Sequence, residues 1–244
     1  MKKKRIRPSQ GMLSVILLLT ALCGIFSYFA NRADAPVASA DAPSPQKAAP
    51  TIVLDAGHGG EDGGAVSDTG VVEKNLNLSL TLMLKDMLVA NGYRVILTRE
   101  SDTLLYDKNS DYEGRKKALD LAARKQIAEE TPNCLFVSIH MNTYPLPTCT
   151  GLQVWYSPNN PASLELARAL QSTAKELLQP ENDRAVKAAG SSIYLLHNLA
   201  TPAVLIECGF LSTPEEAELL ASPAYQKQLA FTIFCGLTEY LAKE

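Results

Sequence analysis

The stretch TIVLDAGHGG, residues 51–60, joins a short apolar run to an aspartate and then to a histidine set among glycines. A short apolar run bounded by turn residues is typical of a buried strand. The glycines beyond its end permit backbone angles that a residue with a Cβ resists, and they let a bulky group or an ion approach closely. We therefore expect His58 to lie exposed at a strand end, as a ligand or a catalytic group.

Short β-rich runs alternate with helical stretches along the rest of the chain. The expected strands are 51–55, 93–98, 134–139, 151–156 and 203–207, and the expected helices are about 74–90, 113–129, 161–178, 214–220 and 223–242. This alternation predicts a single α/β domain, residues 50–244, with a mostly parallel mixed sheet flanked by helices. Residues 75–84 also alternate with the period of a strand, but the length of the pattern and the Asn-Gly pair that follows it favour a helix.

The N-terminus has the pattern of an export signal. A basic flank, MKKKRIR, precedes a stretch without charge from Pro8 to Ala30. The apolar part is near the ~20 residues that span a bilayer, so residues 1–30 are either a cleaved signal or a membrane anchor. Residues 31–49 are rich in Ala, Pro, Asp and Ser, which predicts a disordered linker. We therefore expect the folded domain to be exported across the cytoplasmic membrane.

Charge and cysteine content narrow the function classes. Residues 51–244 hold 16 basic and 24 acidic residues, a formal net charge of −8. An acidic domain is a poor candidate for binding nucleic acid, because neutralising phosphates requires clustered Lys and Arg. The five cysteines include no CxxC pair, which excludes a zinc knuckle and a thioredoxin-like motif, and we expect free thiols.

A second histidine has the same context as His58. His140 ends the apolar run CLFVSI, residues 134–139. Sites in open α/β sheets form outside the carboxyl ends of the strands, so two such histidines can meet in one cleft. Either histidine alone is more simply explained as a capping residue, but two in matching positions favour a shared site. His197, which follows IYLL, is expected to be exposed to solvent.

A catalytic zinc site commonly has three protein ligands and one open position. Glu73 fits as the third ligand, because it opens the helix that follows the loop beginning at His58. An acid at a helix N-terminus is also favoured by the helix dipole alone. The acids that compete with it on chemistry are Asp55, Glu61, Asp62 and Asp68. Spacing does not choose among these donors.

Glu207 follows the apolar run AVLI at another strand end. A carboxylate there costs free energy unless it is paired or functional. Hydrolysis at zinc requires a base that takes a proton from the attacking water and returns it to the leaving amine, and Glu207 is our candidate. The alternatives are a structural ion pair with Arg115 or Arg99, or a site in which Cys208 is the nucleophile.

These segments resemble the zinc-dependent N-acetylmuramoyl-L-alanine amidases of the amidase-3 type. The motifs IVLDAGHGGEDGGA, VVEKNLNLSL, LFVSIHMN and PAVLIECGFLS occur in the order of that family. The resemblance covers about residues 51–241. With no cell-wall repeats and a short tail, the chain is most similar to the CwlD-type, germination-specific members that act on the spore cortex.

The resemblance implies roles for individual residues. His58, Glu73 and His140 would be the Zn²⁺ ligands, and Glu207 would be the catalytic acid and base. The bond cut would be the amide between N-acetylmuramic acid and L-alanine in peptidoglycan, in the cell wall or the spore cortex. The partners would be the glycan strand, its stem peptide, the membrane through residues 1–30, and an accessory protein.

Two further residues are candidates for contact with substrate. Asn142 is placed to form hydrogen bonds with it, and Arg115 could pair with a carboxylate of the stem peptide or stabilise Glu207. Either residue could instead be purely structural.

Two other functions fit the same residues. A zinc peptidase acting on the stem peptide itself would have the same ligands and a different pocket. A non-catalytic wall-binding module would use zinc only for stability. Glu207 argues against the module, because structural zinc sites close with four protein ligands.

Overall fold

The computed structural model describes residues 49–107, 109, 112–146 and 148–243. The expected signal or anchor, residues 1–30, and the linker up to residue 48 lie outside these residues, so both stay predictions. Among the described residues, no helix has the length and apolar character needed to cross a membrane.

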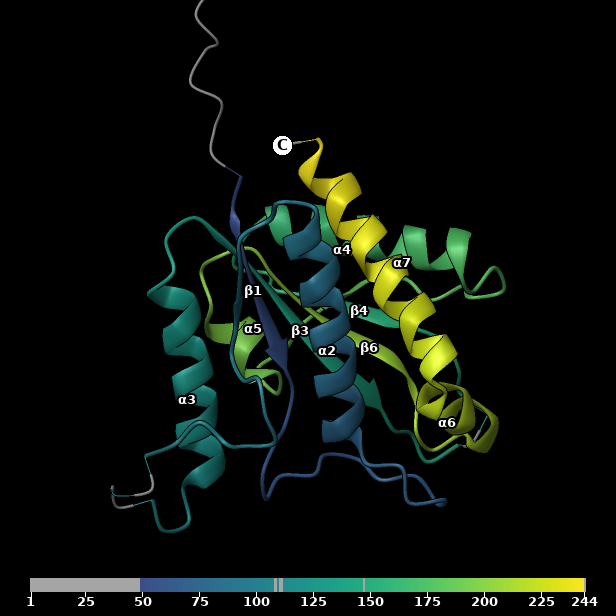
Figure 1. Cartoon of the computed structure of the whole chain (residues 1–244), viewed down its shortest axis with the longest axis horizontal. Coiled ribbons are helices and arrows are strands. Elements are labelled where there is room, and N and C mark those ends of the chain that lie inside the picture. The colour runs from purple at the N-terminus through teal and green to yellow at the C-terminus, as the bar shows by residue number, and fades with distance from the viewer. Residues whose placement is uncertain (1–48, 108, 110–111, 147, 244) are drawn as a thin grey trace, which may run out of the picture. The chain divides into compact units, whose positions relative to one another are not determined.

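The centre of the domain is a six-stranded sheet in the order β2-β1-β3-β6-β4-β5 (Figure 1). Its strands are β1 (Thr51–Ala56), β2 (Val95–Leu97), β3 (Cys134–Asn142), β4 (Gln153–Tyr156), β5 (Lys187–Ala188) and β6 (Ala203–Phe210). Only the β4–β6 pairing is antiparallel, and the other four pairings of this sheet are parallel. The expected mostly parallel mixed sheet is confirmed.

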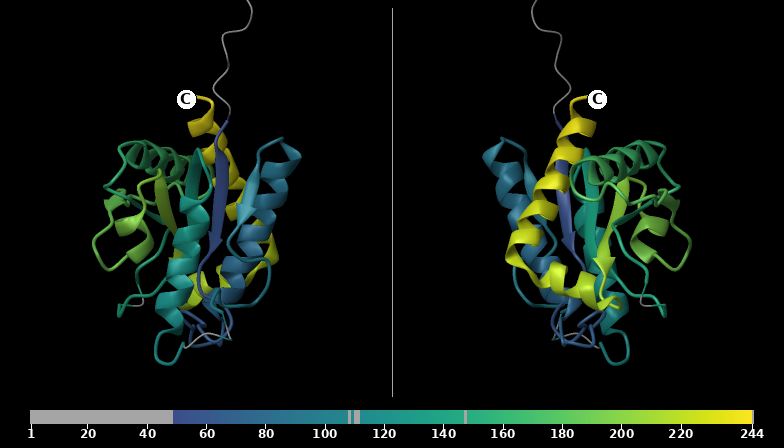
Figure 2. Two further views of the ribbon diagram at one scale, coloured as in Figure 1. Left: turned by 90° about the vertical axis from the view of Figure 1, so that its left-hand side faces the viewer. Right: turned by 90° about the vertical axis from the view of Figure 1, so that its right-hand side faces the viewer.

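Helices cover both faces of the sheet. They are α2 (Glu73–Ala90), α3 (Lys116–Glu129), α4 (Ala162–Leu177), α5 (Tyr194–Asn198), α6 (Pro214–Ala221) and α7 (Pro223–Leu241). The larger apolar core lies between the sheet and α2, α4 and α7, and a smaller core lies between the sheet and α3 and α5. Figure 2 shows the helices on the two sides of the sheet.

The structure departs from the expected elements in two short pieces. The two-residue strand β5 and the five-residue helix α5 were not predicted, because segments this short carry no readable periodicity. Residues 75–84 form part of α2, which confirms the choice of helix over strand. Strand β1 is buried on both faces, which explains why its sequence reads as one continuous apolar run.

A buried arginine ties α3 to the end of β1. The side chain of Arg124 is 1% exposed. Its Nη1 donates hydrogen bonds to Asp55 Oδ1 at 2.6 Å and to the Ala56 carbonyl at 2.8 Å, while its Nε donates to Asp120 Oδ2 at 2.7 Å. Burial acts to raise the pKa of Asp55, but Arg124 and the hydroxyl of Ser138 outweigh it and hold that pKa below its usual range. Asp55 is therefore a buried carboxylate that remains charged.

We expect Arg124→Met to lower the free energy of unfolding by about 3–5 kcal/mol, because it leaves Asp55 and Asp120 as buried charges without their partner. Lys125→Met is the matched control in the same helix. Lys125 is paired with Glu129 at the surface, and such pairs contribute about 0.3–0.5 kcal/mol. Urea denaturation of both variants measures the difference, and equal losses would contradict the structural role of Arg124.

Candidate metal centre

His58, Glu73 and His140 meet at the carboxyl end of the sheet. Each offers one ligand atom, and these atoms all lie within 4.8 Å of one another. His58 follows β1 and His140 lies near the end of β3, and these two strands are parallel neighbours. Glu73 is the first residue of α2, where the loop that leaves β1 returns to the sheet. The cluster is therefore assembled by the order of the strands and by one returning loop.

The Glu73 carboxylate is buried and held by the backbone around it. The residue is 3% exposed. Its Oε1 accepts a hydrogen bond from the Met141 amide at 3.0 Å and its Oε2 accepts one from the Ala65 amide at 2.8 Å. Asn77, one turn further along α2, donates from Nδ2 to Oε1 at 3.3 Å. These donors fix the direction in which Glu73 points.

The two imidazoles lie on either side of this carboxylate. His140 Nδ1 is 2.9 Å from Glu73 Oε1, and His58 Nε2 is 3.3 Å from Glu73 Oε2. Burial acts to raise the pKa of Glu73, but the two histidines outweigh it and keep that pKa well below its usual range. The ring centroids of the histidines are 4.9 Å apart, with an interplanar angle of 75°. Three donor groups of metal-binding type thus converge on one point.

Asp62 contacts the imidazole of His58, and Arg124 contacts its backbone carbonyl. Asp62 Oδ2 lies 2.9 Å from His58 Nδ1, which leaves Nε2 as the nitrogen that faces Glu73. Carboxylates in this position orient the histidines of metal sites. The backbone of His58 has a φ of 62°, an uncommon conformation for a residue other than glycine. Arg124 Nη2 donates to the His58 carbonyl at 2.7 Å and stabilises that conformation.

The other acids that competed with Glu73 lie outside the cluster. Asp55 is directed at Arg124. Glu61 is at the surface, paired with Lys116 at 2.6 Å. Asp68 is exposed. Asp62 touches the cluster only through His58.

Glu207 lies beside the cluster on β6. It is in register with His140 of β3, so the two side chains share a face of the sheet. The register then shifts, because β3 advances two residues to Asn142 while β6 advances three to Phe210. Asn142 donates a hydrogen bond from Nδ2 to Glu207 Oε2. Burial raises the pKa of Glu207 above its usual range, which suits a group that takes and returns a proton.

The remaining candidates have other roles or positions. Arg99 is buried and donates to the carbonyls of Ala56 and Gly57, so it is committed to the backbone rather than to Glu207. Arg115 lies exposed just before α3. Cys208 is 0% exposed, and burial raises the pKa of its thiol, which keeps it protonated and unsuited to be a nucleophile.

His197 lies in α5 and is exposed, as expected. The cysteines of the described residues, Cys134, Cys149, Cys208 and Cys235, are free, which confirms the expectation of free thiols for these four.

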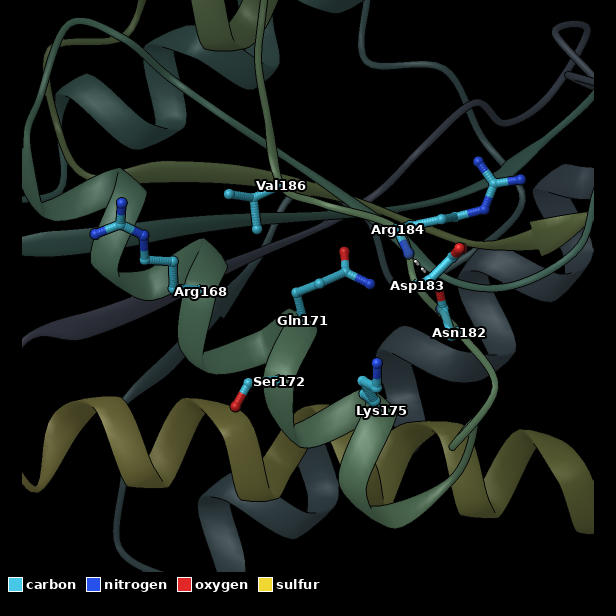
Figure 3. Close-up of a pocket in the computed structure, with 8 residues that line it drawn as sticks. All are labelled: Arg168, Gln171, Ser172, Lys175, Asn182, Asp183, Arg184 and Val186. Carbon is cyan, nitrogen blue, oxygen red and sulfur yellow. Dashed lines mark hydrogen bonds between the residues drawn. The ribbon is translucent and has the colours of Figure 1, made fainter.

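A hollow of about 300 Å³ lies along α4 and the segment that precedes β5 (Figure 3). It is lined by Arg168, Gln171, Ser172, Lys175, Asn182, Asp183, Arg184 and Val186. Gln171 and Asn182 both donate to the carbonyl of Leu152 at the start of β4. Their polar groups thus support the fold, and none of the lining residues belongs to the cluster.

The fold and the cluster agree with comparisons to known proteins. The sequence profile described as N-acetylmuramoyl-L-alanine amidase matches residues 52–239. The chain belongs to the N-acetylmuramoyl-L-alanine amidase family. The resemblance inferred from the four motifs is therefore confirmed.

Individual relatives of this amidase chain cover most of its length. The germination-specific N-acetylmuramoyl-L-alanine amidase of Bacillus subtilis is 37% identical over 193 residues, covering 79% of this chain and 80% of the relative. The CwlD amidase of Clostridioides difficile, solved in complex with the GerS lipoprotein, has a TM-score of 0.75 and 38% identity, covering 80% of this chain and 100% of that one. The amidase AmiC2 of Nostoc punctiforme has a TM-score of 0.67 and 30% identity, covering 79% and 97%.

Sequence reasoning missed the residues that hold the cluster in place. Asn77 lies four residues after Glu73, on the same face of α2, and that spacing is a signal that could have found it. Arg124 lies in a helix with many surface charges, so no pattern distinguishes it from its exposed neighbours. Asp62 was considered as a ligand, but its role as the partner of a histidine depends on the path of the loop.

We expect Gly64→Ala to weaken Zn²⁺ binding at least about tenfold. A Cβ at Gly64 would lie 2.5 Å from Glu73 Oε2 and 2.7 Å from His58 Cδ2, so it would displace both side chains. Gly70→Ala is the control, because Gly70 has a similar positive φ, 84° against 69°, but no atom lies within 4 Å of its added Cβ. Both changes carry the backbone cost of about 1 kcal/mol. Zn²⁺ titration against a competing chelator measures the affinity, and thermal unfolding measures the backbone cost. Equal Zn²⁺ affinities of the two variants would contradict the close packing of Gly64 against Glu73 and His58.

Proposed function

We propose that this chain is a zinc-dependent amidase that hydrolyses the amide bond between N-acetylmuramic acid and L-alanine in peptidoglycan. The observation that carries the proposal is the His58–Glu73–His140 cluster with Glu207 in register beside His140. Membership of the amidase family supports the same reaction. The similarity to a germination-specific relative supports the spore cortex as the material that is cut.

The residues present fit a zinc ion. Two imidazoles and one carboxylate are a common ligand set of catalytic zinc, whereas Ca²⁺ and Mg²⁺ prefer oxygen ligands. The backbone of Gly57 packs directly against the cluster, because a Cβ at Gly57 would lie 2.2 Å from His140 Nε2. A bound Zn²⁺ would supply Lewis acidity for the water and for the scissile carbonyl. We assign His58, Glu73 and His140 as its ligands.

In the proposed mechanism Glu207 moves the proton. It accepts a proton from the attacking water and returns it to the nitrogen of L-alanine as the carbon–nitrogen bond breaks. Its partial burial raises its pKa, so it is a stronger base than an exposed carboxylate. Asn142 holds the Glu207 carboxylate in place through its hydrogen bond, and we propose that it also contacts substrate. Arg115, exposed before α3, is proposed to pair with a carboxylate of the stem peptide.

The setting of the reaction is also part of the proposal. The named relatives act on peptidoglycan, which supports a site of action outside the cytoplasmic membrane. We propose that residues 1–30 direct the chain there and either remain as an anchor or are removed. One solved relative forms a complex with a lipoprotein, and we propose that an accessory protein assists this chain as well.

We expect Glu207→Gln to retain Zn²⁺ and to lose hydrolysis by about 10²–10⁴-fold, because glutamine has the same shape but cannot carry the proton. His58→Ala should lose both the metal and the activity. Metal analysis and a peptidoglycan hydrolysis assay on the same preparations test both variants. Normal turnover by Glu207→Gln would overturn its assignment as the base.

The bond that is cut distinguishes an amidase from a zinc peptidase with the same ligands. We expect mass spectrometry of digested peptidoglycan to show peptides that begin with L-alanine and glycan strands that remain intact. Shortened peptides still attached to muramic acid would assign the chain to the peptidase class. Wild type stripped of zinc by a chelator serves as the control for background hydrolysis.

A further inference from the structure

Polar side chains continue across the sheet beyond Glu207, onto β4 and β5. Gln153 of β4 is in register with Glu207, and Trp155 of β4 is in register with both Leu205 of β6 and Lys187 of β5. Paired residues of neighbouring strands have side chains on the same face, and so do residues two apart along one strand. Gln153, Trp155 and Lys187 therefore share the face that presents Glu207.

Lys187 is a cation at the free edge of this face. Its side chain is exposed, and its Nζ lies 5.2 Å from the centroid of the Trp155 ring. Stacking on an aromatic ring limits where the ammonium group lies. No carboxylate lies within ion-pair distance of it among the residues that the structure describes.

Gln153, between these two groups, has an unused acceptor. The residue is 1% exposed, and its Nε2 donates to the Ala185 carbonyl at 2.5 Å. Its Oε1 is buried and has no hydrogen-bond partner within the described part of the chain. The oxygen is closed to solvent, so contact with a bound peptide falls to Lys187 rather than to Gln153.

The spacing of these groups matches two residues of a peptide. Neighbouring strands lie about 4.8 Å apart, so β5 is roughly 10 Å from β6. Lys187 is level with Leu205, two residues or about 7 Å along the strand from Glu207, so the two backbones are roughly 12 Å apart at these residues. Two extended residues span about 7 Å. A peptide whose first nitrogen is beside Glu207 thus brings the carboxylate of its second residue within the length of the flexible lysine stem.

We propose that Lys187, stacked on Trp155, binds the α-carboxylate of an acidic second residue of the stem peptide. This inference rests on the proposed amidase function and specifies its substrate. Residues 51–244 carry a net charge of −8, so an anionic peptide needs a local cation to bind. The enzyme is therefore selective for stem peptides in which that carboxylate is free rather than amidated.

The test compares two soluble muropeptides that differ only in whether the α-carboxyl of a glutamate at the second position is free or amidated. We expect the zinc-loaded wild type to have a KM about two- to fivefold lower for the free acid, with kcat values within about twofold, as for one exposed charge pair. Lys187→Ala should raise KM for the free-acid muropeptide to the KM of the amidated one, and it should leave KM for the amidated muropeptide unchanged. Lys187→Arg should retain the preference, and higher salt should reduce it.

The control is Lys227→Ala, an exposed lysine of α7 on the other side of the sheet, which should behave as wild type. Equal effects of Lys187→Ala on both substrates, or no effect on either, would overturn the inference while the amidase function stands. Hydrolysis of neither substrate by the zinc-loaded wild type would instead be a failure of the proposed function, and the inference would fall with it.

Discussion

The buried guanidinium of Arg124 is the interaction on which the rest of the site depends. It joins α3 to the end of β1 and donates to the carbonyl of His58. Two arginines, Arg124 and Arg99, together bind the carbonyls of residues 56–58 just where the strand ladder stops. A strand end without such donors would leave buried carbonyls unpaired. The positive φ of His58 is thus maintained by hydrogen bonds to the backbone carbonyls and not by contacts of the imidazole.

The electrostatics of the cluster follow from the same arrangement. The positive charge of Arg124 lies behind the cluster and is neutralised by Asp55 and Asp120. The negative charge of Glu73 faces the two imidazoles and is fixed by backbone amides. Glu207, beside them, has weaker support and a raised pKa. Glu73 is therefore held ionised, whereas Glu207 keeps its proton to a higher pH than an exposed carboxylate does.

Much of this could be predicted from the sequence, because strand ends and glycine-rich loops leave readable patterns. The α/β class, the mostly parallel sheet and the meeting of His58 with His140 follow from apolar runs that end in polar residues. The choice of Glu73 over Asp62 did not follow from spacing, since both lie in or just after the same loop. The role of Arg124 could not be predicted, because burial of a charge depends on contacts between α3 and the end of β1, which join residues 66 or more positions apart. Strand β5 could not be predicted for a different reason, because its two residues are too few to show a periodic pattern.

The register shift between β3 and β6 lets one strand serve both the metal cluster and the core. The extra residue of β6 separates the regular ladder, which buries Val204 and Ile206, from the tip that carries Phe210. Beyond such a bulge, the alternation of inward and outward residues starts afresh. Leu211, just past the bulge, therefore packs in the same core cluster as Val204 and Ile206. One short strand thus turns Glu207 toward the metal cluster and still buries apolar side chains at its far end.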